Sequence, residues 1–287
     1  MLYNFSGLKY NAPERKKPSY ERTVLSMKKI TVLLLAALLA LSCLAGCGAS
    51  SKSDLKYIQD KGTMIVGITD YAPMDYKDDN GEWTGFDAEL ARMVCEELGV
   101  KCEFFVLSDW GKKFYELETK NIDAIWNGMT ITEEVKLNTS CSDPYVINAQ
   151  VLVMKADVVG DYDSVESLAA LTFAVENGSA GQEALASCGI TGDNVTAVQD
   201  QAAALMEVAA GTSDACVIDI TMANAMTGEG TSYADLASGM SLTSEEYGIG
   251  FRKESDVTAK VNEILAKLRA DGTLQALADK YSLTLAG

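Results

Sequence analysis

The sequence predicts an α/β fold with two lobes, and three observations support that prediction. Short apolar runs, typical of buried parallel strands, alternate with segments whose apolar residues recur every three or four positions, as in amphipathic helices. This alternation starts again near residue 150, which indicates a second α/β unit. The chain has 287 residues, of which 48% are hydrophobic and 23% charged, and this is enough for two globular lobes.

The first unit is expected to alternate strands and helices. Its opening strand is the apolar run 63–68, and we expect Asp87 to cap the helix that follows and Gly99 to end it. The later segments are predicted, in order, as strand 102–106, helix 110–120 and strand 122–126. The order strand–helix–strand predicts a mainly parallel sheet with right-handed crossovers.

The second unit repeats this order, and two helices close the chain. The predicted strands are 151–154, 171–175, 194–198 and 215–218. The predicted helices are 178–187, 201–210, 257–270 and 273–281. Because ligands of α/β proteins bind at the carboxyl ends of strands, we expect a ligand crevice between the lobes.

The N-terminal segment has the features of a bacterial lipoprotein signal peptide, which we place at residues 27–46. Two lysines follow Met27, an apolar run covers 30–41, and small residues precede Cys47. An uncleaved anchor is disfavoured because the run is shorter than the roughly 20 residues of a spanning helix. Residues 1–26 are interpreted as sequence upstream of the true start, with a long basic leader as the alternative.

Removal of the whole signal segment, residues 1–46, would leave Cys47 as a lipid-modified (palmitoylated) N-terminus on a tether at 47–54. The net charge of −17 disfavours binding to nucleic acid and to anionic lipid surfaces. Attachment to the membrane is therefore expected through the lipid on Cys47 alone. The sequence predicts an extracytoplasmic protein, anchored to the cell membrane as a lipoprotein.

The composition also limits catalysis and metal binding. The sequence contains no histidine, which excludes Ser–His–Asp and Cys–His catalysis and histidine-ligated zinc. We expect no catalytic residue, no metal site and no organic cofactor. The enzymatic alternative is a hydrolase or lyase that uses carboxylates such as Asp70, Glu176, Glu183 or Asp219.

The cysteines of the mature chain suggest one disulfide. Cys95 lies late in a predicted helix and Cys102 enters the next strand, so the turn between them allows the two residues to come within bonding distance in an oxidising compartment. Cys141, Cys188 and Cys216 lie in apolar or turn contexts, where buried free thiols are the simpler interpretation.

Six motifs, in order along the chain, resemble the polar amino acid substrate-binding proteins of ABC importers, solute-binding protein family 3. They are VGITDYAP at 66–73, TGFD at 84–87, NIDAIWNGMTIT at 121–132, SDPY at 142–145, ACVID at 215–219 and YGIGFRK at 247–253. The resemblance extends over residues 55–285. It implies a periplasmic-binding-protein clamshell of type 2 with a two-strand hinge. Lobe I would comprise 54–149 plus 249–287, and lobe II 150–248.

The resemblance also implies which residues contact the ligand. They are Asp70, Tyr71, Trp110, Asn127, Gly128, Thr130, Thr132, Ser179 and Asp219. Asp219, at the end of a lobe II strand, matches the family carboxylate that pairs with the ligand α-amino group. Structural roles remain open for several of these residues: a turn or cap for Asp70, core packing for Trp110, and helix capping for Thr130, Thr132 and Asp219.

Two positions depart from the family pattern. Val135 stands where the family has an arginine that clamps the ligand carboxylate, and Ala180 stands where it has a second hydroxyl residue. Both changes weaken the carboxylate end of the site. The sequence predicts a monomeric receptor for a small polar solute. An amino acid is the favoured ligand, with an amine or amide as the alternative, and ABC permease subunits are the expected partners. A ligand-sensing module is the alternative function.

Overall fold

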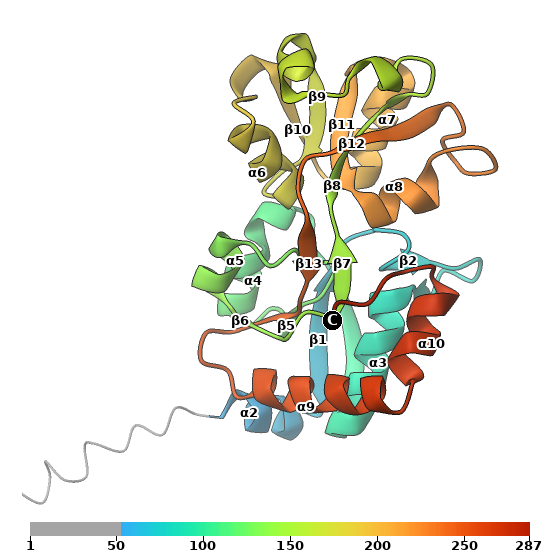
Figure 1. The fold of residues 1–287 in the computed structure, drawn as a ribbon. Helices are drawn as coiled ribbons and strands as arrows, with labels where there is room; N and C mark the ends of the chain where they lie inside the picture. Colours follow the sequence, from blue (N-terminus) through green and yellow to red (C-terminus); the bar gives the residue numbers. More distant parts are fainter. Residues whose placement is uncertain (1–52) are drawn as a thin grey trace, which may run out of the picture. The chain divides into compact units, whose positions relative to one another are not determined.

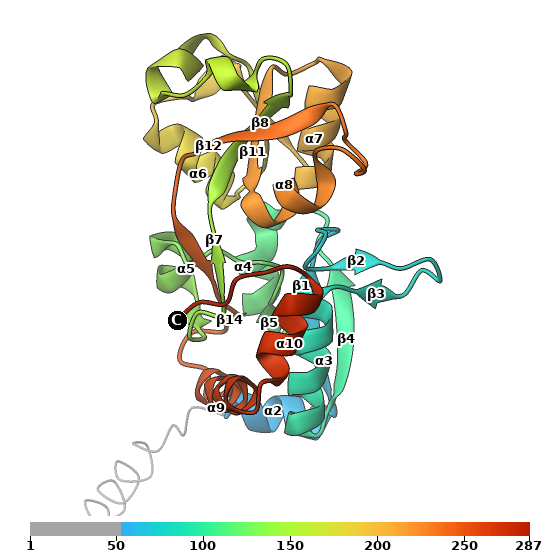
Figure 2. The same cartoon turned by 45° about the vertical axis from the view of Figure 1, so that its right-hand side comes forward.

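The computed structural model describes residues 53–287, which fold into two lobes (Figures 1 and 2). The predicted signal segment, Cys47 and most of the tether lie outside these residues. Within the described range, no helix is both long enough and apolar enough to cross a membrane.

Lobe I is built on a five-stranded sheet in the order β4-β1-β5-β14-β6. The strands are β1 (Thr63–Ile68), β4 (Lys101–Val106), β5 (Ala124–Ile125), β6 (Ser140–Cys141) and β14 (Gly250–Phe251). The helices are α2 (Asp54–Lys61), α3 (Phe86–Leu98), η1 (Trp110–Lys112), α4 (Lys113–Glu118), α5 (Glu133–Asn138), α9 (Val257–Ala270) and α10 (Thr273–Lys280). A small hairpin, β2 (Tyr76–Lys77) and β3 (Trp83–Thr84), extends from this lobe (Figure 2).

Lobe II has a second five-stranded sheet in the order β10-β9-β11-β8-β12. Its strands are β8 (Gln150–Lys155), β9 (Phe173–Glu176), β10 (Val195–Val198), β11 (Ala215–Asp219) and β12 (Leu236–Ser241). Its helices are η2 (Val159–Asp161), η3 (Val165–Ala170), α6 (Ala180–Ser187), η4 (Gly192–Asn194), α7 (Gln201–Ala210) and α8 (Ile220–Met226).

Two antiparallel strands connect the lobes. They are β7 (Val146–Asn148), which continues into β8, and β13 (Glu245–Tyr247), which follows β12. Figure 1 shows both strands between the two lobes. Because the chain crosses twice in opposite directions, the segments that follow each crossing enter their sheets antiparallel to the existing strands.

The structure confirms the predicted two-lobed α/β fold, with one refinement. The predicted strands and helices are present, but both sheets are mixed. In lobe I, β1 pairs in parallel with β4 and β5, whereas β14 is antiparallel to its neighbours. In lobe II, β8 is antiparallel to both β11 and β12. The sequence pattern had not indicated β12, β13 or β14 as strands, since they are short or partly exposed.

The expected capping role of Asp87 is wrong. Gly85 occupies the N-cap of α3 at φ 115°, and a Cβ there would lie 2.3 Å from the Met74 carbonyl oxygen, so only glycine fits. Asp87 is instead a buried residue of the first turn. Its Oδ2 accepts hydrogen bonds from the Gly128 N–H (2.6 Å) and the Tyr145 hydroxyl (2.9 Å). The predicted helix end at Gly99 is confirmed.

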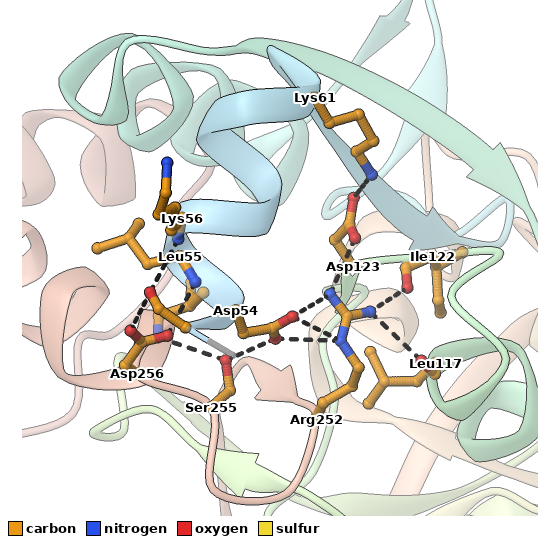
Figure 3. A network of polar contacts seen from close by, with 12 residues as sticks. Asp54, Leu55, Lys56, Lys61, Leu117, Ile122, Asp123, Arg252, Ser255 and Asp256 are labelled. Atoms are coloured by element: carbon orange, nitrogen blue, oxygen red, sulfur yellow. Dashed lines mark hydrogen bonds and ion pairs between the residues drawn. The ribbon is translucent and has the colours of Figure 1, made fainter. Parts of the chain in front are cut away.

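An ionic cluster centred on Arg252 links α2, the loop before β5 and the segment after β14 (Figure 3). The Arg252 Nε lies 3.0 Å from each carboxylate oxygen of Asp54, and its Nη2 lies 2.9 Å from Asp123 Oδ1. Its Nη1 donates to the Ile122 carbonyl oxygen (2.8 Å), and Lys61 pairs with the other oxygen of Asp123. Every charge in this cluster has a partner within the protein.

Cys95 and Cys102 are both free thiols in the structure. The two thiols lie close enough to interact. A hydrogen bond with Cys102, followed by burial, raises the pKa of the Cys95 thiol. The disulfide between them stays a prediction. Cys141, Cys188 and Cys216 are also free.

Candidate functional site

A cavity of about 410 Å³ lies between the lobes and is lined by residues of both. All but two of the predicted contact residues line it: Trp110, Asn127, Gly128, Thr130, Thr132, Ser179 and Asp219. The residues at the two unusual positions, Val135 and Ala180, line it as well.

The lobes touch each other beside this cavity. The Lys113 Nζ of lobe I donates to the Gly178 carbonyl oxygen of lobe II (2.9 Å), and the Asn177 Nδ2 donates to Asp109 Oδ1 (3.1 Å). A Cβ on Gly178 would lie 2.7 Å from the Gly111 Cα, so glycine permits this close approach. The structure therefore has the lobes in a closed arrangement.

Asp219 ends β11 with its carboxylate buried on the cavity wall. Its Oδ1 accepts from the Gln150 Nε2 (2.7 Å) and the Asn148 Nδ2, and its Oδ2 accepts from the Gln201 Nε2. Burial raises the pKa of Asp219 to about 6, against the lowering effect of the Gln201 amide. Although Asp219 is the N-cap residue of α8, its side chain makes no capping hydrogen bond.

All three predicted hydroxyl residues line the cavity, but they differ in whether they also cap a helix. Thr132 and Ser179 do both: the Thr132 Oγ1 accepts from the Val135 N–H (3.3 Å), and the Ser179 Oγ accepts from the Gln182 N–H (3.2 Å). Thr130 caps no helix. Its Oγ1 donates to Glu245 Oε2 on β13 (3.0 Å), which links the cavity wall to a crossing strand.

Asn127 and Gly128 shape the floor after β5. The Asn127 side chain accepts from the Thr69 N–H (2.8 Å) and donates to the Thr69 Oγ1 (2.7 Å), which fixes the neighbouring loop. The Gly128 N–H donates to Asp87, so this donor is already used within the protein. At φ 55°, a Cβ on Gly128 would lie 2.5 Å from the Tyr71 ring.

The other two predicted contact residues, Asp70 and Tyr71, do not line this cavity. Tyr71 is buried beneath Gly128, and its hydroxyl lies 2.5 Å from both the Thr221 Oγ1 and the Tyr247 hydroxyl. Tyr71 therefore supports the cavity floor across the lobes. Asp70 is exposed at the end of its strand.

Two buried charged residues in the cavity lining were not among the predicted contacts. Lys113, on α4, is 4% exposed, lies with its Nζ 4.9 Å from the centre of the Trp110 ring, and lines the cavity. Burial lowers the pKa of Lys113 to about 8. Glu176 ends β9, is also 4% exposed, and its Oε1 has no hydrogen-bond partner. Burial, followed by the nearby Asp219, raises the pKa of Glu176 well above its usual range.

The sequence carried a signal for one of these two residues. Glu176 follows the apolar strand Phe173–Val175, as Asp219 follows its own strand, and parallel strands present their carboxyl ends at one edge of a sheet. Lys113 gave no such signal, because a lysine in an amphipathic helix is normally exposed. In the part of the chain that the structure describes, no group of three or more acidic or cysteine side chains is arranged to hold a metal ion.

Comparison with known proteins gives a consistent result. The sequence profile described as "Bacterial extracellular solute-binding proteins, family 3" matches residues 64–284. The lysine/arginine/ornithine-binding periplasmic protein of Escherichia coli K12 is 32% identical over 256 residues, which cover 85% of this chain and 96% of that protein. The L-cystine-binding protein TcyJ of the same organism is 28% identical over 252 residues, covering 86% and 94%.

A solved structure shows the same fold. A crystal structure of the P235GK mutant of ArgBP from T. maritima superposes with a TM-score of 0.73 at 33% identity, and covers 79% of this chain and 98% of that one. These relatives are non-catalytic binding proteins, so the comparisons favour a binding function over the hydrolase or lyase alternative.

Proposed function

The chain belongs to the bacterial extracellular solute-binding proteins, family 3, and we propose that it is a lipid-anchored receptor that delivers an α-amino acid to an ABC importer. The observation that carries this proposal is the buried carboxylate of Asp219 on the wall of the cavity between the two lobes. A buried carboxylate held by neutral amide donors is suited to an ammonium group, since a charge-assisted hydrogen bond replaces the water that closure removes. Relatives named for L-cystine and for lysine, arginine and ornithine bind amino acids, which supports the choice of ligand.

The ligand carboxylate requires a different partner from the family arginine. Of the described residues that line the cavity, Lys113 is the one with a cationic side chain. We assign the carboxylate to Lys113, with the Ser179 hydroxyl beside it. The Thr130 hydroxyl already donates to Glu245, so its oxygen is left to accept from the ligand ammonium group. The remaining contacts in this proposal are the ring of Trp110 and the groups of Asn127, Gly128 and Thr132. Because Asp70 and Tyr71 lie outside the cavity lining, they act in this proposal by shaping the first loop.

Closure couples binding to transport. A ligand that touches Asp219 in lobe II and Lys113 in lobe I stabilises the closed state relative to the open one, and this differential affinity shifts the population. The closed form is the one that we expect the permease to recognise. The direct bonds of Lys113 to Gly178 and of Asn177 to Asp109 would add to the same state.

The test of the ligand assignment is Asp219→Ala. The variant should weaken binding of an amino acid found in a thermal-shift screen by about 30- to 150-fold, which corresponds to about 2–3 kcal/mol. Asp193→Ala, an exposed aspartate of the same lobe, is the matched control and should leave affinity unchanged. Unchanged affinity of Asp219→Ala for every ligand that binds would refute the site.

A second comparison tests the carboxylate end. Calorimetric titration with an amino acid and with its own carboxamide separates a receptor for acids from one for amines. If Lys113 holds the carboxylate, the acid binds more tightly and Lys113→Met removes the difference. A carboxamide that outcompetes its parent acid would mean that the natural ligand lacks a free carboxylate.

The lipid anchor has its own test. The proposal rests on the small residues before Cys47, which lie outside the described part of the chain. Cys47→Ser should release a folded protein that binds ligand normally into the soluble fraction. Retention of that variant in the membrane fraction after cell fractionation would contradict lipid attachment at Cys47.

A further inference from the structure

The lining of the cavity contains more acidic side chains than basic ones. Three ionisable side chains in its lining are at least nine-tenths buried: Lys113, Glu176 and Asp219. Two further carboxylates, Glu134 on α5 and Glu183 on α6, line it while remaining exposed. With both buried carboxylates ionised, the buried set carries a net charge of −1, and the exposed pair adds to the same sign.

The two buried carboxylates differ in how the protein satisfies them. Asp219 accepts hydrogen bonds from Asn148, Gln150 and Gln201, so both of its oxygens have partners. Glu176 Oε1 is buried without a partner. A buried acceptor without a partner is unfavourable, and the cost is larger for a charged group. Glu176 therefore has one oxygen without a hydrogen-bond donor, whereas both oxygens of Asp219 have donors.

The nearby Lys113 does not supply the missing hydrogen bond to Glu176. The Lys113 ammonium donates to the Gly178 carbonyl oxygen and lies within 5.0 Å of the ring centres of both Trp110 and Phe114. In the proposed function its charge is assigned to the ligand carboxylate. A donor for Glu176 must then come from the ligand.

We infer that Glu176 is a specificity-determining residue, which binds a second cationic group of the ligand and selects an amino acid with an ammonium or guanidinium side chain. This inference rests on the proposed function and deepens it. The charges then balance: the α-ammonium group pairs with Asp219, the carboxylate with Lys113, and the side-chain cation with Glu176. Buried charges left without partners are strongly unfavourable, so neutral and acidic amino acids bind less well. Glu134 and Glu183 at the exposed part of the lining favour the approach of a cation.

Binding of such a ligand is coupled to a proton. The groups that face Glu176 are Asp219, Asp200, Lys113 and Gln201. Burial, followed by the charges of Asp219 and Asp200, keeps the pKa of Glu176 high in the absence of a cation, against the lowering effects of Lys113 and of the hydrogen bond from Gln201. A cation at Glu176 favours the ionised form, so the carboxyl group releases its proton when the ligand binds.

The test uses pairs of ligands that share a shape and differ in charge. L-Arginine is compared with L-citrulline, in which a urea group replaces the guanidinium group, and L-lysine with L-norleucine. Wild-type protein should prefer the cationic member of at least one pair by about 10- to 100-fold. Glu176→Gln should reduce that preference to less than about threefold, chiefly by weakening the cation. Glu166→Gln, an exposed carboxylate of the same lobe that lies outside the cavity lining, is the matched control and should keep the preference.

Proton release provides a readout that needs no variant. Calorimetry of wild-type protein near pH 7, in two buffers of different ionisation enthalpy, should show net proton release with the cationic ligand and less with its neutral partner. Glu176→Gln should remove the difference. A wild-type preference for the neutral members, a preference that survives in Glu176→Gln, or equal proton release for both members would overturn the inference.

The outcomes also separate this inference from the proposed function. If neutral or acidic amino acids bind and depend on Asp219 while cationic ones do not, the role of Glu176 is refuted and the proposed receptor function stands. If none of the twenty amino acids binds, the proposed function fails and the inference fails with it.

Discussion

Two buried ionic clusters in this molecule differ in whether the protein supplies a partner for every charged group. Around Arg252, the guanidinium, both carboxylates and the Lys61 ammonium all have partners supplied by the protein (Figure 3). In the cavity, Glu176 has a buried oxygen with no partner, and Lys113 faces more carboxylates than it can neutralise. Both clusters are removed from water, yet only the first is complete.

This difference separates a structural role from a binding role. A cluster whose charges are satisfied within the chain fixes elements that are distant in sequence, here α2, the loop before β5 and the segment after β14. A cluster that is left incomplete at a cavity destabilises the unliganded state and gains most when a ligand supplies the missing group. Burial of charge alone would not have distinguished the two.

The largest expected effect is on the complete cluster. Arg252→Ala leaves the carboxylates of Asp54 and Asp123 buried without their main partner, and should lower the free energy of unfolding by about 3–5 kcal/mol. Lys260→Ala removes an exposed pair with Glu263 and is the control, with an expected loss below about 1 kcal/mol. Urea denaturation monitored by circular dichroism measures both.

The comparison between clusters would break if Arg252→Ala unfolded like the control variant. It would also break if the variant lost ligand affinity while keeping its stability, since that would give Arg252 a role at the binding site.

A pH titration sharpens the comparison on the cavity side. The pKa of Asp219 in the unliganded protein is about 6, above its usual value of 3.8, and the ligand ammonium group requires the ionised form. Affinity for a neutral amino acid should therefore be greatest between about pH 6 and pH 8. It should fall about tenfold per unit as the pH decreases below 6, and fall again above 8, where Lys113 loses its proton. Asp219→Asn should bind weakly and without this pH dependence.

The same raised pKa has the opposite effect on folding. Between about pH 4 and pH 6 the folded protein binds a proton at Asp219 more tightly than the unfolded chain does. Its contribution to the stability of the unliganded protein therefore decreases as the pH rises through this window. A ligand affinity that increased as the pH fell from 7 to 5 would contradict the assignment of Asp219.

The fold could be predicted from the sequence because its signals are local. The apolar run of β1, the helix stop at Gly99 and the restart after residue 150 each depend on neighbouring residues only, and all three appear in the structure. The antiparallel strands could not be predicted in the same way. Their direction depends on two chain crossings that are about 100 residues apart, at β7 and β13.

The candidate site could be predicted in part, for a related reason. Asp219 was identified because it ends an apolar strand and because its motif resembles a family. The expected cap at Asp87 was wrong because its partners, Gly128 and Tyr145, are distant in sequence. The role of Lys113 depends on the lobe II carbonyl at Gly178, and no helical pattern contains that information.

The smallest change in stability is expected for a substitution at Thr130, which lines the cavity and is also hydrogen-bonded within the protein. Its Oγ1 donates to Glu245, which also accepts from Gln150 (3.0 Å) and Asn148 (3.2 Å). Thr130→Val keeps the shape of the cavity wall, and Glu245 keeps two donors, so the free energy of unfolding should change by less than about 0.5 kcal/mol. Ligand affinity should fall by about 2- to 10-fold if the hydroxyl oxygen accepts from the ligand ammonium group. Thr132→Val is the useful contrast, because it loses the cap of α5 and should lower stability by about 1 kcal/mol. If Thr130→Val lowered stability as much as Thr132→Val and left affinity unchanged, Thr130 would belong with Arg252 among the structural residues. The residues with a purely structural role would then include one that lines the cavity.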